Sequence, residues 1–486
     1  MPKMRFFLLF AGFALCLSTI YSNTLFTYYA HHDDYIYFMT DKDQVTLNPY
    51  VETELSNGRY LLGLFYSIFD PFVETIADLA RLRLFVIFVL SICGAIIFSV
   101  INNYFRNSIY SFLFILTVFT LPPFEILVSW AHNASKSISL LFACLSFYWA
   151  ARNSIPLAVT LFICALCTYP SGAMFYWFIL FIHLAGQKPP FFAGIKQEKR
   201  FFIAGLGAIV AYAILVHFLK PWVGTLTNAI YNPYIHTTDI FGKIGWFAKE
   251  PLTNSLNLWN LFPKKTYTAL SLALIFAGAL KYLVSAKNEI KNILLFGIWG
   301  IIFLILTFLP NWVTSANVAF YRCSLALTPF VFFILTWSLL QIIAILPRNM
   351  LKNTTAIIFF IVCIYGSFLA FANTAHYRAL PSGWEITFLK NQLKRADLYT
   401  FKKIHFILPA GKLYENVRRY DEFGVPSSHY RQDIPIMLKS ALREIGLENF
   451  FWYWYERNGI SIGKETDPLP TDKETLIIRF SEMYKN

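Results

Sequence analysis

Long apolar runs, separated by short polar turns, occupy most of the chain. Several of them reach the ~18 or more apolar residues that a bilayer-spanning helix needs. The pattern predicts an α-helical polytopic membrane protein with about eleven transmembrane helices. The expected spans are residues 6–29, 84–104, 108–128, 137–151, 155–168, 172–185, 201–219, 266–284, 293–309, 323–346 and 354–373. No internal repeat is visible along this series.

Basic residues orient the predicted spans, because Lys and Arg concentrate in cytoplasmic loops. Lys3 and Arg5 precede the first run, and no small-x-small cleavage site closes it. The run is therefore expected to act as an uncleaved signal anchor that starts in the cytoplasm. Residues 31–83 and 220–265 then become the two large outer loops. An odd number of crossings also places the C-terminus outside.

A proline pair interrupts the third span near its outer end. Pro122 and Pro123 cannot donate backbone hydrogen bonds, so they free carbonyl groups that need other partners. This end of the span is expected to bend or to line a polar cavity. Glu125 lies beside the pair and either has a function there or pairs with Lys136 across the outer surface.

The composition changes near residue 374. Residues 1–373 form the predicted transmembrane module, whereas residues 374–486 carry about the quarter of charged residues that is normal for soluble proteins. We therefore expect a small α/β domain outside the membrane. Its predicted elements are strands at 403–408 and 474–479 and a helix at 433–449. The domain either binds a glycan, with Trp452, Tyr453, Trp454 and Tyr455 as stacking surfaces, or packs against the membrane.

The overall composition supports a membrane protein and excludes other classes. The 486 residues are 57% hydrophobic and only 14% charged, against about 25% charged in soluble domains. The net charge of +13 comes without a basic, aromatic-interleaved soluble surface, so no nucleic-acid partner is expected. The positive charge either orients the spans in the membrane or attracts anionic lipid or a phosphate-bearing substrate.

Local motifs exclude further kinds of chemistry. The seven cysteines lie in or beside apolar runs and predict neither a disulfide framework nor a zinc site. The nucleotide-binding, zinc-protease and serine-hydrolase motifs are not found in the sequence. Nucleotide hydrolysis and acyl-enzyme chemistry therefore have no support.

An acidic pair, Asp33-Asp34, follows the first apolar run directly. Two carboxylates beside a hydrocarbon core are costly unless they have a function or a partner. Burial and the adjacent like charge are expected to raise the pKa of at least one of them, and such a carboxylate can act as general base toward a hydroxyl. Two alternatives stay open: a metal site that also uses Asp41 and Asp43, or a solvated cap on the first span.

Cationic side chains are expected at the same outer surface. His31 and His32 precede the acidic pair and either orient the carboxylates, bind phosphate when protonated, or fill the interface. Arg59 is expected near the lipid headgroups, where a guanidinium suits phosphate or anchors the chain. Arg322 stands at the outer mouth of the tenth span, against the usual inner bias of Arg. Further candidate phosphate ligands are Lys136 and Lys264.

The acidic pair in the first outer loop, the many spans and the outer domain together resemble the GT-C class of polytopic glycosyltransferases. More closely, the chain resembles the phage-borne serotype-converting O-antigen glucosyltransferases of that class, type II in particular. The motifs that carry the resemblance are Asp33-Asp34-Tyr35 and Asn57-Gly58-Arg59-Tyr60. The resemblance covers the whole architecture, but these motifs are short.

The resemblance implies an enzyme of the bacterial inner membrane, with the N-terminus in the cytoplasm and the soluble domain in the periplasm. Its donor would be undecaprenyl-phosphate glucose. Its acceptor would be a rhamnose of lipid-linked lipopolysaccharide O-antigen. Functional links to a flippase and to the synthase of the lipid-linked glucose follow from this chemistry.

The resemblance also implies inversion at the sugar by one direct displacement, which needs one general base and cations around the departing phosphate. The base would be Asp33 or Asp34. The substrate-binding residues would be His31, His32, Arg59, Tyr60, Lys136, Lys264 and Arg322. No cofactor is expected, and metal-independent action is favoured over the divalent metal that some GT-C enzymes use.

Two other classes of protein compete with this interpretation. A lipid-linked sugar flippase or another transporter would be expected to show internal repeats and charged residues near span midpoints. Another GT-C transferase, or an O-antigen polymerase or ligase, shares the architecture, and only the resemblance favours glucose. A purely structural membrane scaffold would leave the acidic pair without a role.

Overall fold

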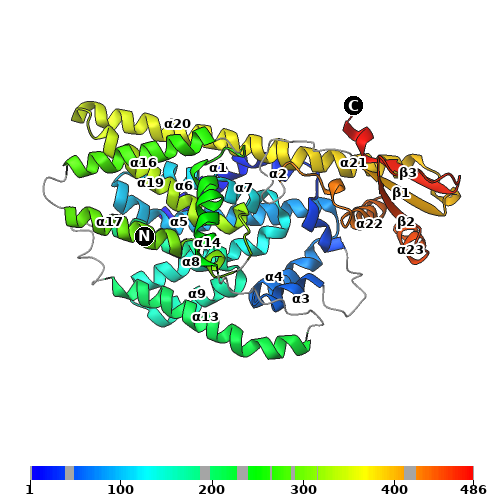
Figure 1. The fold of residues 1–486 in the computed structure, drawn as a ribbon, viewed down its shortest axis with the longest axis horizontal. Helices are drawn as coiled ribbons and strands as arrows, with labels where there is room; N and C mark the ends of the chain where they lie inside the picture. The colour runs from blue at the N-terminus through cyan, green and yellow to red at the C-terminus, as the bar shows by residue number, and fades with distance from the viewer. Residues whose placement is uncertain are drawn as a thin grey trace.

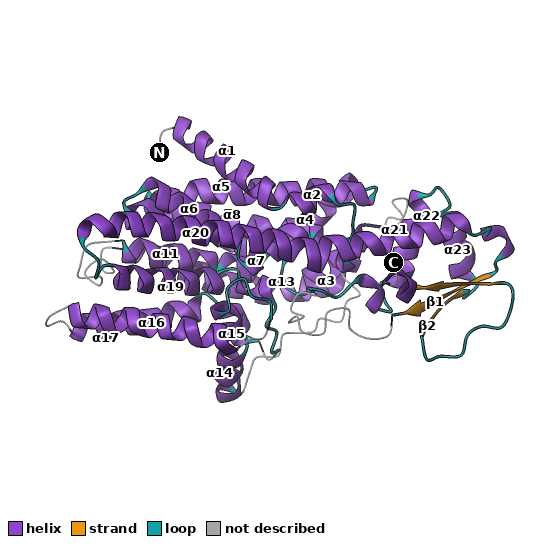
Figure 2. Ribbon diagram, turned by 90° about the horizontal axis from the view of Figure 1, so that it is seen from above, coloured by secondary structure: helices purple, strands orange, loops and turns teal. Residues whose placement is uncertain are grey.

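The computed structural model describes residues 3–38, 49–186, 198–226, 239–262, 265–285, 290–314, 316–409 and 423–484. The molecule is elongated: its helices run along the long axis, and a small sheet lies at the end that carries the C-terminus (Figure 1). Figure 2 shows helix α20 (Arg348–Thr374) crossing the length of the bundle toward the C-terminal part. Lys264, Asp41 and Asp43 lie outside the described residues.

Apolar helices form the body of the molecule, because their nearly uniform Phe, Leu, Ile and Val sequences bury one another's side chains. These helices are α1 (Lys3–Ile20), α2 (Ser22–Phe26), α5 (Leu79–Phe105), α6 (Ser108–Val118), α7 (Pro122–Ser129), α8 (Ala134–Ala151), α9 (Ile155–Thr168), α10 (Pro170–Ala173), α11 (Phe175–Ala185), α13 (Lys199–Leu226), α16 (Lys265–Ser285), α17 (Ile290–Leu306), α19 (Leu327–Ile343) and α20.

Every expected span overlaps one of these helices, so the predicted helical character of the chain is confirmed. Among the described residues, six helices are long and apolar enough to cross a membrane, and the bent pair α6 and α7 makes a seventh. Four further apolar helices are shorter than that, at Ile155–Thr168, Pro170–Ala185, Gly297–Leu306 and Leu327–Ile343. The figure of eleven crossings therefore stays a prediction.

The proline pair has the expected effect on the third span. Helix α6 ends at Val118, and α7 begins at Pro122 with its axis turned by 65°. Proline is tolerated in the first turn of a helix, where its missing N–H would have no intrahelical partner. Glu125 in α7 is fully buried and accepts a hydrogen bond from Asn373 Nδ2 at 3.2 Å. Of the two alternatives for Glu125, the pairing with Lys136 is wrong, because Lys136 Nζ donates to Asn133 Oδ1 instead.

Basic helix ends meet at one end of the bundle. Arg5 donates to Ser108 Oγ at the start of α6, and Tyr110 Oη donates to the Lys352 carbonyl at the start of α20. Arg200 donates to Asn153 Oδ1 in the same way between the starts of α13 and α9. The predicted outer segments meet at the other end of these helices.

Short helices cover that other end. Helices α3 (Pro49–Ser56) and α4 (Tyr60–Phe69) turn about Gly58, whose φ of 76° is a conformation that favours glycine. Helix α5 begins at Leu79, so Arg83 lies a full turn inside it and is buried, rather than ending the outer loop. The remaining elements here are the 3₁₀ helices η1 (His32–Phe38), η2 (Asp70–Phe72), η3 (Ile76–Asp78), η4 (Ala131–Asn133) and η5 (Tyr321–Ser324) and helices α14 (Ile240–Lys249), α15 (Pro251–Leu256) and α18 (Leu309–Val313).

One continuous helix joins the bundle to the C-terminal part. Helix α20 passes through a π-helical turn (Ala375–Ala379) into α21 (Leu380–Arg395), so the predicted boundary near residue 374 falls inside an unbroken helix. A π turn inserts one residue into the helix and is frequent at functional sites. The chain then continues through the 3₁₀ turn Leu398–Thr400 to the sheet.

The C-terminal sheet has three parallel strands in the order β2-β1-β3. Strand β1 (Lys403–Leu408) has the predicted bounds, β3 (Thr475–Arg479) begins one residue late, and β2 (Ile460–Lys464) was not predicted. Helices α22 (Ile434–Glu444) and α23 (Asn449–Glu456) replace the single predicted helix. The remaining elements are the 3₁₀ turns Ser427–His429 and Phe480–Tyr484.

The aromatic cluster of α23 divides between core and surface. Trp454 is fully buried and its indole Nε1 donates to the Phe401 carbonyl at 3.2 Å, whereas Tyr455 is 56% exposed. The prediction of Trp454 as a stacking surface for a glycan is therefore wrong, because its ring belongs to the core of this domain.

Candidate functional site

The residues of the acidic pair face different neighbours. The chain leaves α2 in extended conformation at Thr27 and begins η1 at His32, whose φ is 41°. Such left-handed backbone is uncommon outside glycine, although His adopts it more readily than most residues. With three residues per turn, successive side chains of a 3₁₀ helix point about 120° apart. Asp33 and Asp34 therefore meet separate surroundings.

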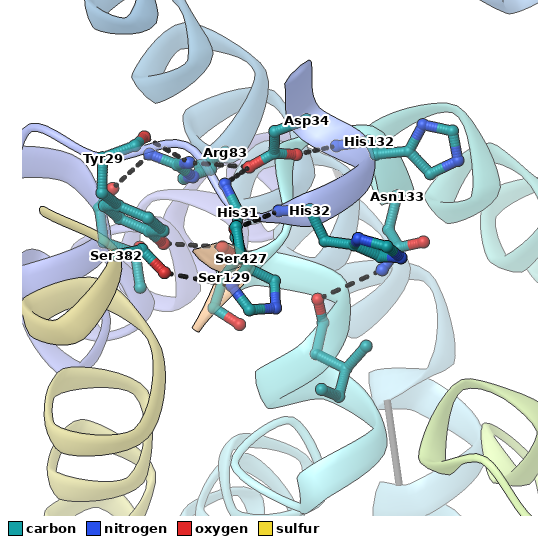
Figure 3. A network of polar contacts seen from close by, with 12 residues as sticks. Tyr29, His31, His32, Asp34, Arg83, Ser129, His132, Asn133, Ser382 and Ser427 are labelled. Carbon is teal, nitrogen blue, oxygen red and sulfur yellow. Dashed lines mark hydrogen bonds and ion pairs between the residues drawn. The ribbon is translucent and has the colours of Figure 1, made fainter. Parts of the chain in front are cut away.

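Asp34 is fully buried and saturated with donors. Arg83 Nη2 donates to its Oδ2 at 3.1 Å, and the backbone N–H groups of His31 and His132 donate to Oδ2 and Oδ1 at 3.2 and 2.8 Å (Figure 3). Burial raises the pKa of Asp34, and Arg83 with the two backbone N–H groups partly offsets the rise. These contacts tie η1 to α5 and to the turn before α8.

Arg83 extends this buried unit toward the first helix. Its Nη2 also donates to the Tyr29 carbonyl at 3.0 Å, and its guanidinium lies 3.6 Å from the centre of the Tyr29 ring. The Tyr29 hydroxyl in turn donates to the Ser129 carbonyl at 2.6 Å (Figure 3). Because both Asp34 and Arg83 are at most 1% exposed, this ion pair is part of the core.

Asp33 lies on a different side of η1 and keeps 17% of its side chain exposed. His32 Nε2 lies 3.5 Å from its Oδ1. Burial tends to raise the pKa of Asp33, but the charges of His132, His32, Lys136 and Arg322 outweigh burial and hold the pKa below its ordinary value. The raised pKa expected of a catalytic carboxylate therefore belongs to Asp34, and the more accessible carboxylate is kept ionised by nearby cations.

Two cations, one of them Lys136, are arranged around Tyr169. The Arg59 guanidinium lies 5.3 Å and Lys136 Nζ 5.7 Å from the centre of its ring. Glu54 accepts a hydrogen bond from Arg59 Nη1 at 2.9 Å and so fixes the guanidinium. Lys136 stands in the first turn of α8 and donates to Asn133 Oδ1 at 2.8 Å. Tyr169 is 4% exposed, so its ring packs against the two cations. Two neighbouring cations are suited to a phosphate group.

Two further guanidinium groups are arranged around Trp130. Arg322 in η5 lies 5.1 Å from the centre of a Trp130 ring, and Arg378 in the π turn lies 4.9 Å from it. Arg378 is fully buried and also contacts the ring of Phe423 at 5.1 Å. The indole N–H of Trp130 is buried and has no hydrogen-bond partner among the described residues. Buried donors are normally hydrogen-bonded, so a water molecule or a ligand is expected to accept from this N–H.

The histidines next to the acidic pair are held in place by the protein. His31 is 1% exposed, and its Nδ1 lies 3.0 Å from Ser382 Oγ (Figure 3). Burial lowers the pKa of His31 well below its ordinary value, and the charge of Arg378 acts in the same direction. A neutral, buried imidazole cannot bind phosphate as a cation, so His31 supports η1 instead. His132 lies 2.7 Å from the Tyr66 hydroxyl through its Nε2.

The structure gathers most of the predicted site residues in one region. His32, Asp33, Arg59, Lys136 and Arg322 surround it, and Tyr60 opens α4 directly after Arg59. Lys264 lies outside the described residues. The residues that sequence reasoning missed are Glu54, Arg83, Trp130, His132, Tyr169, Arg378 and Asp433. A signal existed for Arg83, since it is a charged residue that opens a long apolar run.

Within the described residues, no group of three or more His, Cys, Asp or Glu side chains has the arrangement of a metal site. No protein-family model matches this chain, and no curated protein is significantly similar to it. The resemblance to the GT-C transferases accordingly stays a prediction, and we infer the function from the site itself.

Proposed function

We propose that this protein is an inverting glycosyltransferase that moves glucose from undecaprenyl-phosphate glucose to a rhamnose of O-antigen. The observation that carries the proposal is the arrangement around Asp33. An ionised carboxylate that is 17% exposed stands near Lys136 and Arg322 at one end of an apolar bundle, and these two cations contact the rings of Tyr169 and Trp130. A general base and cations that bind phosphate are the parts that such a transfer needs.

Asp33 is the general base in this proposal. The acceptor hydroxyl gives its proton to the Asp33 carboxylate while its oxygen forms a bond to the anomeric carbon of glucose. The bond from that carbon to the phosphate oxygen breaks, and its electron pair stays on the phosphate. The lowered pKa of Asp33 keeps its carboxylate ionised at neutral pH, which is the state a general base needs, but it also makes the carboxylate a weaker base.

Asp34 is a positioning residue in this proposal. Its carboxylate already accepts hydrogen bonds from Arg83, His31 and His132. A carboxylate in that state has little capacity left for a substrate hydroxyl. In this proposal Asp34 thus holds η1 in place, and Asp33 removes the proton from the acceptor hydroxyl.

Arg59, Lys136 and Arg322 stabilise the departing phosphate. Negative charge grows on the phosphate oxygen as the bond to glucose breaks, and preorganised cations lower the energy of that state. Lys136 is buried and Arg59 is fixed by Glu54, so these charges need little reorganisation. The Trp130 indole N–H offers a further donor to a sugar hydroxyl or to phosphate.

A membrane-bound lipid donor agrees with the distribution of charge over the bundle. Arg5, Arg106, Arg152 and Lys352 belong to the end opposite the candidate site, where basic residues are expected in the cytoplasm. The candidate site then faces the periplasm, where a nucleotide-sugar donor is not expected. A polyprenyl phosphate keeps its tail in the bilayer and presents its sugar at that surface.

The test is transfer of labelled glucose from undecaprenyl-phosphate glucose to lipid-linked O-antigen by the purified full-length protein in nanodiscs. The product is identified by mass spectrometry of the glycan. Transfer by the wild type and its loss in Asp33→Asn, with normal insertion, supports the proposal. Movement of the lipid-linked sugar across the bilayer without a new glycosidic bond would instead indicate a flippase.

A further inference from the structure

His32 stands between two carboxylates that come from distant parts of the chain. Its Nε2 lies 3.5 Å from Asp33 Oδ1, and its Nδ1 pairs with Asp433 Oδ2. Asp433 directly precedes α22 in the C-terminal part, and its side chain is 7% exposed. The order of groups is therefore carboxylate, imidazole, carboxylate, with the accessible member at the candidate site.

The C-terminal part holds His32 through three separate contacts. Besides the ion pair with Asp433, Ser427 Oγ accepts a hydrogen bond from the His32 backbone N–H at 2.9 Å, and the Tyr430 ring lies 4.8 Å from the imidazole (Figure 3 shows the Ser427 contact). Glu385 in α21 is fully buried and accepts the backbone N–H groups of Ser427 and Ser428 at 3.0 and 2.8 Å. The segment that holds His32 is thus itself fixed.

The backbone conformation of His32 indicates that these contacts do more than attach the C-terminal part to the helical bundle. Its φ of 41° is a sparsely populated conformation that persists where the surroundings determine it. That conformation directs the imidazole toward both Asp33 and Asp433. Contacts that only attached the domain to the bundle would not need a strained residue next to the most accessible carboxylate of the site.

We propose that Asp433 is a positioning residue: by pairing with His32 it lets the C-terminal part hold the imidazole against Asp33 and complete the candidate active site. This inference rests on the function proposed above. Asp433 accepts a hydrogen bond from the Nδ1–H of His32, which fixes the ring, and the imidazolium form of the ring presents its Nε2–H to Asp33. The imidazole then orients the Asp33 carboxylate toward the acceptor hydroxyl. Asp433 itself does not touch the substrate.

The first experiment compares steady-state transfer by wild type, Asp433→Asn, Asp433→Glu and the control Asp397→Asn in nanodiscs. Asp397 is an exposed carboxylate of the same domain that caps the turn at Tyr399, a task that Asn also performs. Asp433→Asn is expected to lower kcat by roughly 10- to 100-fold, a part of the about 10²- to 10⁴-fold that a general base contributes. KM for the donor is expected to stay within about twofold, because Asp433 acts on orientation and not on binding.

The remaining variants separate positioning from folding. Asp433→Glu is expected to regain part of kcat, and Asp397→Asn to match the wild type. His32→Gln combined with Asp433→Asn is expected to be no slower than His32→Gln alone, because both act through one contact. A wild-type kcat in Asp433→Asn, or multiplied losses in the double variant, would overturn the proposal.

A second measurement does not depend on the transfer reaction. Amide hydrogen exchange in the peptide that covers η1 is expected to become faster in Asp433→Asn and to stay unchanged in Asp397→Asn. If the wild type transfers no glucose, the function proposed above fails. The exchange data then still test whether the C-terminal part stabilises η1. Unchanged exchange in Asp433→Asn would contradict that hold whatever the activity.

Discussion

Asp33 and Asp34 are adjacent in the chain, but the two sides of η1 that they face are built differently. On the Asp34 side, one carboxylate meets one guanidinium and two backbone donors, and both partners of the ion pair are at most 1% exposed. On the Asp33 side, one carboxylate meets several cations and remains 17% exposed. Burial with matched partners makes Asp34 part of the fold. Accessibility with excess positive charge makes Asp33 suited to reaction with an anionic substrate.

Asp33→Asn is expected to cause the largest loss of activity. The variant keeps the size of the side chain but cannot take a proton, so transfer should fall by roughly 10²- to 10⁴-fold, the contribution of a general base. Folding should be less affected than by loss of the Asp34 contacts, because Asp33 keeps 17% of its side chain exposed whereas Asp34 is fully buried. Transfer assays and thermal unfolding in detergent check both halves. Full activity in this variant would remove the base from the proposed mechanism.

Arg83→Met is expected to act on stability instead. It leaves the buried Asp34 carboxylate without its cation, which typically costs about 3–5 kcal/mol. The free energy of unfolding, or the fraction of folded protein in size-exclusion chromatography, measures this loss. Residual activity should follow the amount of folded protein. A variant that folds normally but transfers no glucose would contradict the division between the two sides.

Lys136→Met is expected to change both the rate and its dependence on pH. Loss of one charged contact to phosphate should lower kcat/KM by about 10-fold, corresponding to about 1.5 kcal/mol. Lys136 also helps to hold the pKa of Asp33 below its ordinary value of 3.8. Without that charge the pKa rises, so Asp33 begins to be protonated at a higher pH as the solution is acidified.

The corresponding measurement is the acid limb of kcat/KM against pH, which should move to higher pH in Lys136→Met. Thermal unfolding serves as the control for folding. An unchanged acid limb would mean that Asp33 is not the group whose ionisation the rate reports.

Tyr29→Phe is expected to have the smallest effect. It removes the hydrogen bond from the Tyr29 hydroxyl to the Ser129 carbonyl but keeps the ring against the Arg83 guanidinium. The loss should be about 0.5–1.5 kcal/mol of stability, with transfer close to wild type. The melting temperature of Tyr29→Phe should fall less than that of Arg83→Met. This comparison measures how much the Tyr29 hydrogen bond and the Arg83–Asp34 ion pair each stabilise the Asp34 side.

Several features of the site were predictable because they depend on position along the chain. An acidic pair at the end of an apolar run, and Arg59 before a short apolar helix, stand near a membrane surface in any arrangement of the spans. Local patterns also determined β1 and the bend at Pro122. Strand β2 (Ile460–Lys464) was not predicted, because its sequence is too short to indicate a strand by itself. Pairing with β1 stabilises it as a strand.

The sequence by itself determined a chain of apolar helices, a polar C-terminal part and a cluster of charged candidates at the end of the first run. Hydrophobicity and residue type carry that information locally. Only the tertiary structure decided that Asp34 pairs with Arg83, that Asp33 lies near Lys136 and Arg322, and that Asp433 reaches His32 across 401 positions of the chain. Packing decides such partners, because a charge buried far from water must find its counterpart wherever the fold brings one close.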